Sequence, residues 1–181
     1  MSRPIQLGIF GWPVAHSKSP QMHEAAANAV GIELRYERFG VEPNDLADAV
    51  RAKHAAGIDG YNLTVPHKQA IMALLDEVDP SARAIGAVNT VVRSGARYVG
   101  HNTDAPGFVR SLEEAGVPVG GSVVALIGAG GAARAGVVGL AEAGAERIRV
   151  LARRPEQAEA LVESLREHCG CPLDAHALAD S

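Results

Sequence analysis

The sequence predicts an α/β protein of two domains, with a mostly parallel sheet covered by helices over residues 1–105 and the start of a second α/β unit over 106–181. Two observations predict this fold class. Short apolar or alternating segments typical of strands are followed repeatedly by helix patterns, the order that builds a largely parallel sheet. A break rich in Gly and Pro at 117–121 then precedes the continuously apolar segment 122–127, which is typical of a buried strand.

Composition and charge exclude several classes of function. With 47% hydrophobic and 21% charged residues in a chain of 181, the balance is that of an ordinary soluble globular protein. A net charge of −4 without a cluster of Lys or Arg argues against a nucleic-acid partner. No apolar run approaches membrane-spanning length, and the N-terminus lacks the apolar stretch of a signal peptide. We therefore expect a cytoplasmic protein; its oligomeric state is not predicted.

The cysteines and histidines predict neither a disulfide nor a metal site. Cys169 and Cys171 are separated by one residue, which makes a poor disulfide framework, and no matching pair nearby would complete a zinc site. The seven histidines are scattered without ligand spacing. Reduced thiols in a metal-free protein are the expectation.

Strands and helices are expected to alternate in the N-terminal part of the chain. Short apolar or alternating patterns predict strands at 5–10, 32–39 and 58–65. Helix patterns follow at 19–30, at 43–56 and after Pro66. Ser19 before Pro20 predicts the first helix start, a hydroxyl cap followed by proline at the first helical position. Residues 87–93 and 96–101 flank a Ser-Gly pair and predict a β-hairpin, an antiparallel piece at one edge of the sheet.

Residues 61–68, YNLTVPHK, predict a strand that ends at Pro66 and a helix that carries Lys68 in its first turn. An ammonium is disfavoured near the positive end of a helix dipole, so a lysine there requires another reason. Proton exchange in catalysis is one such reason, and a solvated surface lysine is the simpler alternative. Asp104, in HNTDAPGF, is expected to be the N-cap of the next helix; it could instead lie beside Lys68 and orient the ammonium.

Several polar residues are candidates for a ligand pocket. Ser17 and Ser19 bracket Lys18, and hydroxyls at a helix N-terminus make a natural carboxylate site. Three polar residues stand on otherwise apolar strands: Asn62, Thr64 and Asn89. Each could be an ordinary strand-end residue, but together they carry the hydrogen-bonding groups that a pocket for a polyhydroxylated ligand requires.

A glycine-rich turn follows the apolar strand 122–127 and opens an alanine-rich helix. It fits the G-x-G-x-x-G/A pattern in its β-α-β context, where glycines permit a tight turn and let backbone N–H groups approach a pyrophosphate. The candidate cofactor-binding residues of this turn are Gly128, Ala129, Gly130, Gly131, Ala132 and Ala133. A turn that merely packs helix on strand is the alternative.

The end of the next strand, 147–152, bears on which dinucleotide the turn would bind. An acidic residue there suits the ribose 2′-hydroxyl of NAD, whereas arginine suits the 2′-phosphate of NADP. Arg153 and Arg154 follow the strand, with no acid before Glu156, which favours NADP. No third strand is predicted before Ser181, so we expect an incomplete Rossmann-type NADP-binding domain.

The sequence resembles the shikimate dehydrogenase family in five segments that occur in the family's order and span nearly the whole chain. They are HSKSPQMHEAA at 16–26, YNLTVPHK at 61–68, GAVNTVV at 86–92, GHNTDAPGF at 100–108 and IGAGGAARA at 127–135. The resemblance implies reversible reduction of 3-dehydroshikimate to shikimate with NADPH, in the route to aromatic amino acids. It also implies roles for particular residues: a catalytic acid/base dyad of Lys68 and Asp104, a carboxylate site at Ser17 and Ser19, and ring-hydroxyl contacts from Asn62, Thr64 and Asn89, with Asp104 also touching the substrate.

Two departures from the family pattern stand out. After the second strand of the cofactor unit the family usually has Asn-Arg-Thr and a later basic residue, where this chain has Ala152-Arg153-Arg154 and Gln157. Arg153 keeps the main phosphate contact, so NADP remains the expected cofactor. Family chains also continue through further Rossmann strands and a C-terminal helical segment, so we expect a fragment, a natural truncation or a chain that depends on a partner.

Three alternatives remain open from the sequence. They are a quinate/shikimate dehydrogenase that uses NAD, a truncated and non-catalytic shikimate-binding protein, and, more distantly, an enzyme like methylene-tetrahydrofolate dehydrogenase. The paired arginines argue against the first alternative. The SKS and NTD segments argue against the third, because they fit a carboxylated cyclohexene better.

Overall fold

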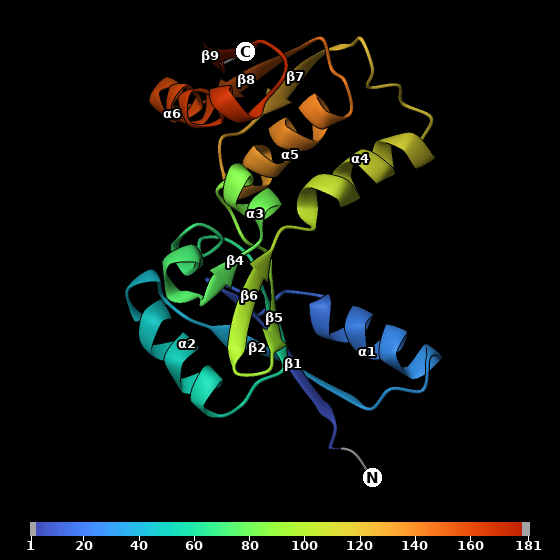
Figure 1. Cartoon of the computed structure of the whole chain (residues 1–181), viewed down its shortest axis with the longest axis vertical. Coiled ribbons are helices and arrows are strands. Elements are labelled where there is room, and N and C mark those ends of the chain that lie inside the picture. Colours follow the sequence, from blue (N-terminus) through green and yellow to red (C-terminus); the bar gives the residue numbers. More distant parts are fainter. Residues whose placement is uncertain (1–2, 179–181) are drawn as a thin grey trace. The chain divides into compact units, whose positions relative to one another are not determined.

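A computed structural model describes residues 3–178, which belong to two compact units (Figure 1). The first unit consists of Met1–Ala82 and Val88–His101, and the second of Arg83–Ala87 and Asn102–Ser181. The expected boundary at 105/106 therefore lies within four residues of this division. The extreme ends of the two predicted domains, 1–2 and 179–181, lie outside the described residues.

The first unit is a mixed six-stranded sheet with helices. Its strands are β1 (Ile5–Gly11), β2 (Leu34–Gly40), β3 (Gly60–Leu63), β4 (Glu77–Val78), β5 (Thr90–Ser94) and β6 (Arg97–His101), in the order β2-β1-β3-β5-β6-β4. Its helices are α1 (Ser19–Ala29), α2 (Leu46–Ala55) and the beginning of α3 (Pro80–Ile85). β1 is parallel to β2 and β3, and β5 is antiparallel to β3 and β6. The hairpin is confirmed, although the short strand β4 continues the sheet beyond it.

The pleat of β3 separates core residues from polar ones. Tyr61 and Leu63 are 2% exposed and belong to the same core cluster as Phe10 of β1. Because side chains alternate along an extended chain, Asn62 and Thr64 point to the other face, and both are half-buried there. The two candidate ligand-binding residues of this segment, Asn62 and Thr64, therefore lie on the same face of the sheet.

The segment after β3 differs from the prediction. The peptide bond between Val65 and Pro66 is cis, and the next helical residues form a 3₁₀ helix at Ala70–Leu74. The prediction that Pro66 opens a helix with Lys68 in its first turn is therefore wrong. Tertiary contacts determine this segment instead, because buried His67 bonds through Nε2 to the Val41 carbonyl at 2.8 Å.

The second unit is built on three parallel strands, β7 (Val123–Ile127), β8 (Arg147–Ala152) and β9 (Leu173–Ala177), in the order β7-β8-β9. Its helices are the end of α3, α4 (Asp104–Glu114), α5 (Gly131–Glu142) and α6 (Pro155–Leu165). The prediction that no third strand forms is wrong. β9 is short, and its sequence alternates too weakly to indicate a strand. Its pairing with β8, reinforced by the Arg147–Asp174 ion pair at 2.7 Å, stabilises it as a strand.

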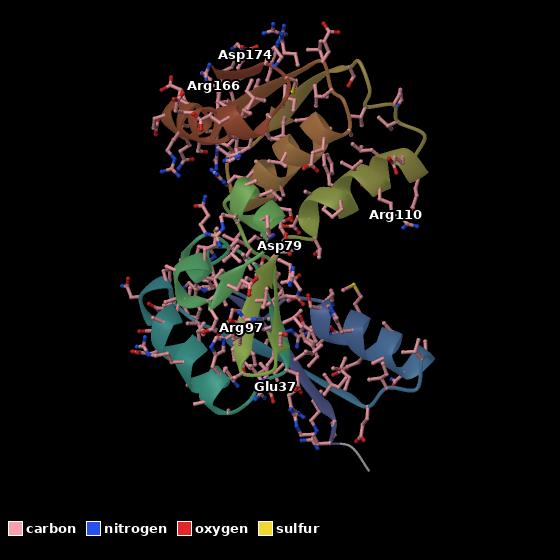
Figure 2. All side chains as sticks on the ribbon, in the orientation of Figure 1. Glu37, Asp79, Arg97, Arg110, Arg166 and Asp174 are labelled. Atoms are coloured by element: carbon pink, nitrogen blue, oxygen red, sulfur yellow. The ribbon has the colours of Figure 1, made fainter. Side chains whose placement is uncertain are left out.

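Charged side chains project from the ribbon of both units (Figure 2). Exposed pairs such as Arg97–Glu77, at 3.2 Å, contribute little to stability because solvent screens them. Within residues 3–178, no helix is long and apolar enough to cross a membrane.

Candidate functional site

In the first unit, a cavity of about 410 Å³ is bordered by the loops that follow β1 and β3. Its lining joins polar and apolar residues: Ser17, Ser19, Thr64 and His16 together with Ile9, Trp12, Pro13, Val14 and Val65. Two peptide bonds on these loops, Trp12–Pro13 and Val65–Pro66, are cis. The Trp12 N–H donates to the Val65 carbonyl at 3.0 Å, which ties the two loops together. Three of the predicted ligand-binding residues thus line one cavity.

The two serines are arranged differently from the prediction. α1 begins at Ser19, and the Ser17 hydroxyl accepts a hydrogen bond from the Ser19 N–H at 3.2 Å. Ser19 is therefore not the N-cap: it is the first residue of α1, and Lys18 stands at the N-cap position without a side-chain cap hydrogen bond. The Ser17 hydroxyl also donates to Ser19 Oγ at 3.1 Å, and the Arg38 guanidinium holds the Ser17 carbonyl at 2.7–2.9 Å. Two hydroxyls thereby stand side by side at the start of a helix.

Asn62 is held by three hydrogen bonds. Its Oδ1 accepts from the Tyr36 hydroxyl at 2.6 Å, and its Nδ2 donates to the Asn89 carbonyl at 3.2 Å and to Thr90 Oγ1 at 3.1 Å. Asn89 is 8% exposed, and its Oδ1 accepts from the Thr90 hydroxyl at 3.0 Å. The structure therefore brings Asn62 and Asn89 together, but neither is among the residues that line the cavity. Their contacts with ring hydroxyls stay a prediction.

Tyr36 belongs to this site although the sequence did not single it out. It is 6% exposed, and burial raises the pKa of its hydroxyl to about 12, while a hydrogen bond with Ser19 acts in the opposite direction. The alternating pattern of 32–39 could have placed this residue on the inner face of a strand. It could not have shown that the hydroxyl lies between Ser19 and Asn62.

Lys68 and Asp104 lie in different units. Lys68 is half-buried in the turn after Pro66, and its carbonyl accepts from the Val88 N–H at 2.8 Å, so its backbone adjoins the segment that carries Asn89. Asp104 is the first residue of α4, and its N–H donates to Asn102 Oδ1 at 2.9 Å. The prediction that Asp104 caps α4 is wrong, because the buried Asn102 side chain provides the acceptor. Pairing of Lys68 with Asp104 stays a prediction.

The glycine-rich turn lies at the carboxyl end of β7. Gly128 has φ +119°, a conformation that L side chains rarely adopt, and its N–H donates to the Leu151 carbonyl at 2.8 Å. A Cβ added at Gly128 or Gly130 would have no atom within 4 Å, so open space surrounds the turn. Gly131 then begins α5, whose first N–H groups have no partner within the helix. The turn has the geometry that an anionic ligand requires.

The two arginines lie beside this turn. A cavity of about 200 Å³ at the carboxyl ends of β7 and β8 is lined by Ile127, Gly128, Ala129, Leu151, Ala152, Arg153, Arg154, Gln157 and Leu178. Arg153 and Arg154 are exposed, so their guanidinium groups are accessible to a ligand. In open parallel sheets, ligands bind outside the carboxyl ends of the strands, which is where these residues gather.

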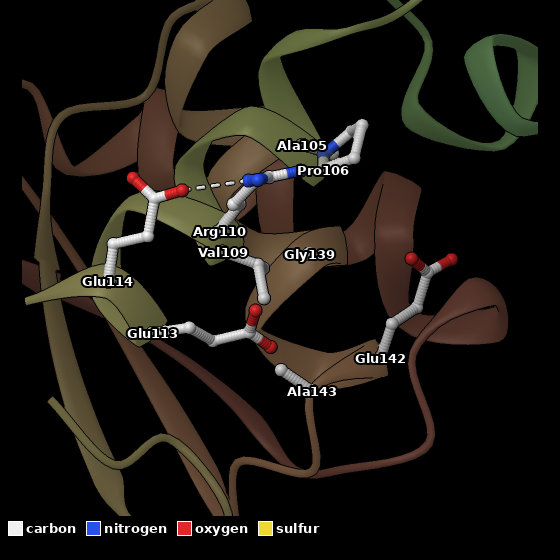
Figure 3. A pocket seen from close by; sticks show the side chains of 9 residues that line it. All are labelled: Ala105, Pro106, Val109, Arg110, Glu113, Glu114, Gly139, Glu142 and Ala143. Carbon is white, nitrogen blue, oxygen red and sulfur yellow. Dashed lines mark hydrogen bonds and ion pairs between the residues drawn. The ribbon is translucent and has the colours of Figure 1, made fainter. Parts of the chain in front are cut away.

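A larger groove of about 590 Å³ between α4 and α5 contains none of the predicted residues (Figure 3). Arg110 and Glu114 form an ion pair at 2.8 Å along its wall, and Glu113 and Glu142 add negative charge. Gly139 permits the close packing of the helices, because a Cβ there would lie 3.0 Å from the Ala105 carbonyl oxygen. This groove is open and lacks the polar network found in the first unit. In the described part of the chain, no group of three His, Cys, Asp or Glu could hold a metal ion.

The second unit thus has the strand order, glycine turn and strand-end arginines of a Rossmann-type dinucleotide-binding fold, and the first unit has a separate polar cavity. A family model, that of the shikimate dehydrogenase substrate binding domain, matches residues 9–91. Over these residues the chain is similar to the shikimate dehydrogenase family.

Individual proteins are similar to this chain along most of its length. Shikimate dehydrogenase (NADP(+)) of Geobacter metallireducens is 50% identical over 175 residues, covering 93% of this chain and 61% of the relative. The enzyme of Symbiobacterium thermophilum is 50% identical over 159 residues, covering 88% and 54%. The chain therefore spans little more than half the length of the curated relatives it matches.

Solved structures agree with the sequence comparisons. The crystal structure of shikimate dehydrogenase from Aquifex aeolicus has a TM-score of 0.88 at 33% identity, covering 98% of this chain and 63% of that one. Shikimate 5-dehydrogenase from Thermus thermophilus, solved in complex with NADP(H) and shikimate, has a TM-score of 0.83 at 41% identity, covering 93% and 62%.

Proposed function

We propose that this chain carries the substrate-binding part, and the first part of the cofactor-binding domain, of an NADP-dependent oxidoreductase that reversibly reduces 3-dehydroshikimate to shikimate in aromatic amino acid biosynthesis. The observation that carries the proposal is the cavity of the first unit, where Ser17, Ser19 and Thr64 meet in a chain about 50% identical to shikimate dehydrogenases (NADP(+)). The first unit would bind the substrate and the second the dinucleotide. The free cysteines, Cys169 and Cys171, accord with a cytoplasmic location.

The cavity suits a carboxylated and hydroxylated ring. Ser17 and Ser19 offer adjacent hydroxyls at the start of α1, where hydrogen-bond donors and the helix dipole both favour a carboxylate. Thr64, Trp12 and Val65 line the cavity, and the last two provide apolar walls for the ring itself. Asn62 and Asn89, which are not among the lining residues, would join Thr64 in binding the ring hydroxyls. In a site of this kind, directional hydrogen bonds recognise the polar substituents, and the shape of the apolar walls recognises the ring.

Lys68 would act as the catalytic acid/base, with Asp104 holding and orienting its ammonium. NADPH, when bound, supplies the hydride that goes to the ketone carbon of 3-dehydroshikimate. The oxygen of that carbonyl then requires a proton, which the Lys68 ammonium would donate; in the reverse direction the neutral amine would accept it from the hydroxyl. The Asp104 carboxylate would also contact the substrate.

The residues of the glycine turn fit a dinucleotide. Backbone N–H groups from Ala129 to Ala133 would face the pyrophosphate at the start of α5, where open space surrounds the turn. Gly128, whose own N–H donates to the Leu151 carbonyl, would shape the turn around the ligand. Arg153 and Arg154 would bind the 2′-phosphate of NADP through charge-assisted hydrogen bonds. Among the described residues that line this cavity, none is negatively charged and would oppose the phosphate.

The test is the loss of NADPH absorbance with 3-dehydroshikimate, for the parent chain, for Lys68→Ala and for the control Lys53→Ala. Lys53 is a second lysine of the first unit, placed over the Phe39 ring and near Glu37. We expect Lys68→Ala to lower kcat at least about 100-fold, the usual contribution of a general acid, and Lys53→Ala to leave it unchanged. An NADH arm measures cofactor preference.

Calorimetry with shikimate separates binding from turnover. Turnover by the parent chain that survives Lys68→Ala would remove the lysine from the mechanism. Shikimate binding without turnover in the parent chain would favour a non-catalytic shikimate-binding protein instead. Absence of shikimate binding would refute the proposed function.

A further inference from the structure

A continuous chain of hydrogen bonds links the proposed ligand-binding residues of the first unit. Ser17 Oγ donates to Ser19 Oγ, and Ser19 is hydrogen-bonded to the Tyr36 hydroxyl. The Tyr36 hydroxyl donates to Asn62 Oδ1 at 2.6 Å. The chain continues from Asn62 Nδ2 to Thr90 Oγ1, and from there to Asn89 Oδ1. Tyr36 is the link between the serine pair and the asparagine pair.

The Tyr36 ring is held firmly in place. It belongs to a small core cluster with Ile9 and Val14, two residues that also line the cavity. The His23 imidazole stacks on it with ring centroids 4.5 Å apart and an interplanar angle of 21°. His23 is itself anchored, because its Nδ1 bonds to the Ser19 carbonyl at 2.9 Å. The hydroxyl therefore has a fixed position from which to donate.

The three hydrogen bonds of Asn62 together fix which way its amide faces, because the Asn89 carbonyl can only accept and Tyr36 holds the oxygen. An amide has two N–H donors and an oxygen with two lone pairs. Both donors of Asn62 are engaged, by the Asn89 carbonyl and by Thr90 Oγ1, and the oxygen accepts from Tyr36. What Asn62 offers a ligand is thus the second lone pair of Oδ1, which accepts a hydrogen bond from a hydroxyl group.

We propose that Tyr36 is a positioning residue that locks the Asn62 amide with its oxygen available to a ligand hydroxyl. The site thereby selects a hydroxylated ring over a ring that bears only a carboxylate. This inference rests on the proposed function for the identity of the ring, and its structural part stands on the first unit alone. Without the Tyr36 hydroxyl, Asn62 Oδ1 loses this donor, and only the two hydrogen bonds of Nδ2 hold the amide.

The test compares two ligands and two variants. Trp12 is the single tryptophan of the chain and lines the cavity, so its fluorescence reports binding directly. Tyr36→Phe removes one oxygen and keeps the stacked ring. We expect it to weaken shikimate binding about tenfold, the value of one good hydrogen bond in a site whose partner is left unpaired. Binding of cyclohex-1-ene-1-carboxylate, which lacks ring hydroxyls, should be unchanged.

Tyr61→Phe is the matched control. Tyr61 is the immediate neighbour of Asn62 and is 2% exposed, but it points to the other face of the sheet. Its hydroxyl is hydrogen-bonded to His54 Nε2 at 2.9 Å. It tests the effect of removing a buried tyrosine hydroxyl as such. Equal loss of shikimate binding in both variants, or equal loss of both ligands in Tyr36→Phe, would overturn the proposal.

A measurement without ligand separates this inference from the proposed function. In ¹⁵N-correlated NMR spectra, the Asn62 side-chain amide should shift in Tyr36→Phe and not in Tyr61→Phe. A parent chain that shows this response but does not bind shikimate leaves the lock intact and refutes the proposed function. An Asn62 amide that does not respond to Tyr36→Phe refutes the lock whatever the ligand results.

Discussion

The two units prepare their candidate sites by opposite means. The first unit arranges side chains, because Ser17, Ser19, Tyr36 and Asn62 form one hydrogen-bonded series beside a cavity. The second unit arranges backbone, because the turn at Gly128 offers N–H groups and open space with few polar side chains of its own. A site made of side chains is specific for the position of each polar group on the ligand. A site made of backbone N–H groups and positive charge binds a phosphate with little regard to the rest of the ligand.

The two units also differ in the side chains that form their cores. All three tyrosines, the tryptophan and two of the three phenylalanines of the chain lie in the first unit. The core cluster of the second unit consists of aliphatic residues alone, such as Val137, Ile148 and Leu161. Buried tyrosines carry polar ends that must be hydrogen-bonded, so the first unit gains direction-specific contacts together with sensitivity to protonation. The core of the second unit has no such tyrosines, so its stability should not depend on contacts of this kind or on protonation in the core.

The largest effect is expected from Gly128→Ala. A Cβ there has space, but φ +119° is unfavourable for any L side chain, so the turn must change shape to relieve the strain. We expect NADP affinity, measured by calorimetry, to fall between about tenfold and 100-fold, which corresponds to the usual cost of such a backbone conformation. Shikimate affinity should be unchanged.

Gly116→Ala is the control for strain alone. Gly116 also has positive φ, +70°, and open space around it, and it lies after α4 in the same unit. Weakened NADP binding in both variants would mean that backbone strain anywhere in the second unit is sufficient to lower NADP affinity. The contrast between backbone and side-chain sites would then fail for the second unit.

A smaller effect, about tenfold, is expected from removing one arginine beside the turn. Arg153→Ala deletes a charge-assisted hydrogen bond to the 2′-phosphate but leaves the backbone contacts to the pyrophosphate. NADP affinity should therefore fall while NAD affinity remains, and the difference should shrink as salt is added, because the arginine is exposed. The control is Arg166→Ala. Arg166 is an exposed arginine that is paired with Glu163, and its removal should change neither affinity.

The elements of regular pattern were predictable from the sequence, and those set by tertiary contacts were not. The strand–turn–helix around Gly128 was predicted because apolar periodicity and glycine spacing are local signals. β9 was missed because its five residues have only a weak alternation, and pairing with β8 stabilises it. The helix at Pro66 was a wrong prediction because buried His67 binds the distant Val41 carbonyl.

The candidate site shows the same division. The resemblance supplied Ser17, Ser19 and Asn62 by motif, and the structure brings them close through Tyr36, which no motif indicated. Hydrogen bonds between residues 26 positions apart in the chain, such as that from Tyr36 to Asn62, leave no trace in local spacing. For the same reason the sequence did not show that Asn102, rather than Asp104, accepts hydrogen bonds from the first N–H groups of α4.

The smallest effect, and the one that tests the difference between the cores, is pH dependence from His54. Its ring stacks on Tyr98, with centroids 3.5 Å apart, and bonds to the Tyr61 hydroxyl. Burial lowers the pKa of His54 below the ordinary value of 6.5, and Asp76 only partly offsets this. Because the unfolded chain then binds a proton more readily than the folded one, stability should be complete above about pH 6.5 and decline as the pH falls below it.

Thermal unfolding at pH 7.5 and 5.5 checks this expectation in each unit. Trp12 fluorescence follows the first unit, which contains the only tryptophan, and methyl NMR signals of Ile148 and Val150 follow the second. We expect a slightly lower midpoint at pH 5.5 in the first unit, a change that His54→Phe should reduce because phenylalanine keeps the stacking and cannot be protonated. An unaltered pH response in His54→Phe would show that other groups cause it, and an equal response in the second unit would mean that its aliphatic core gives no protection from acid.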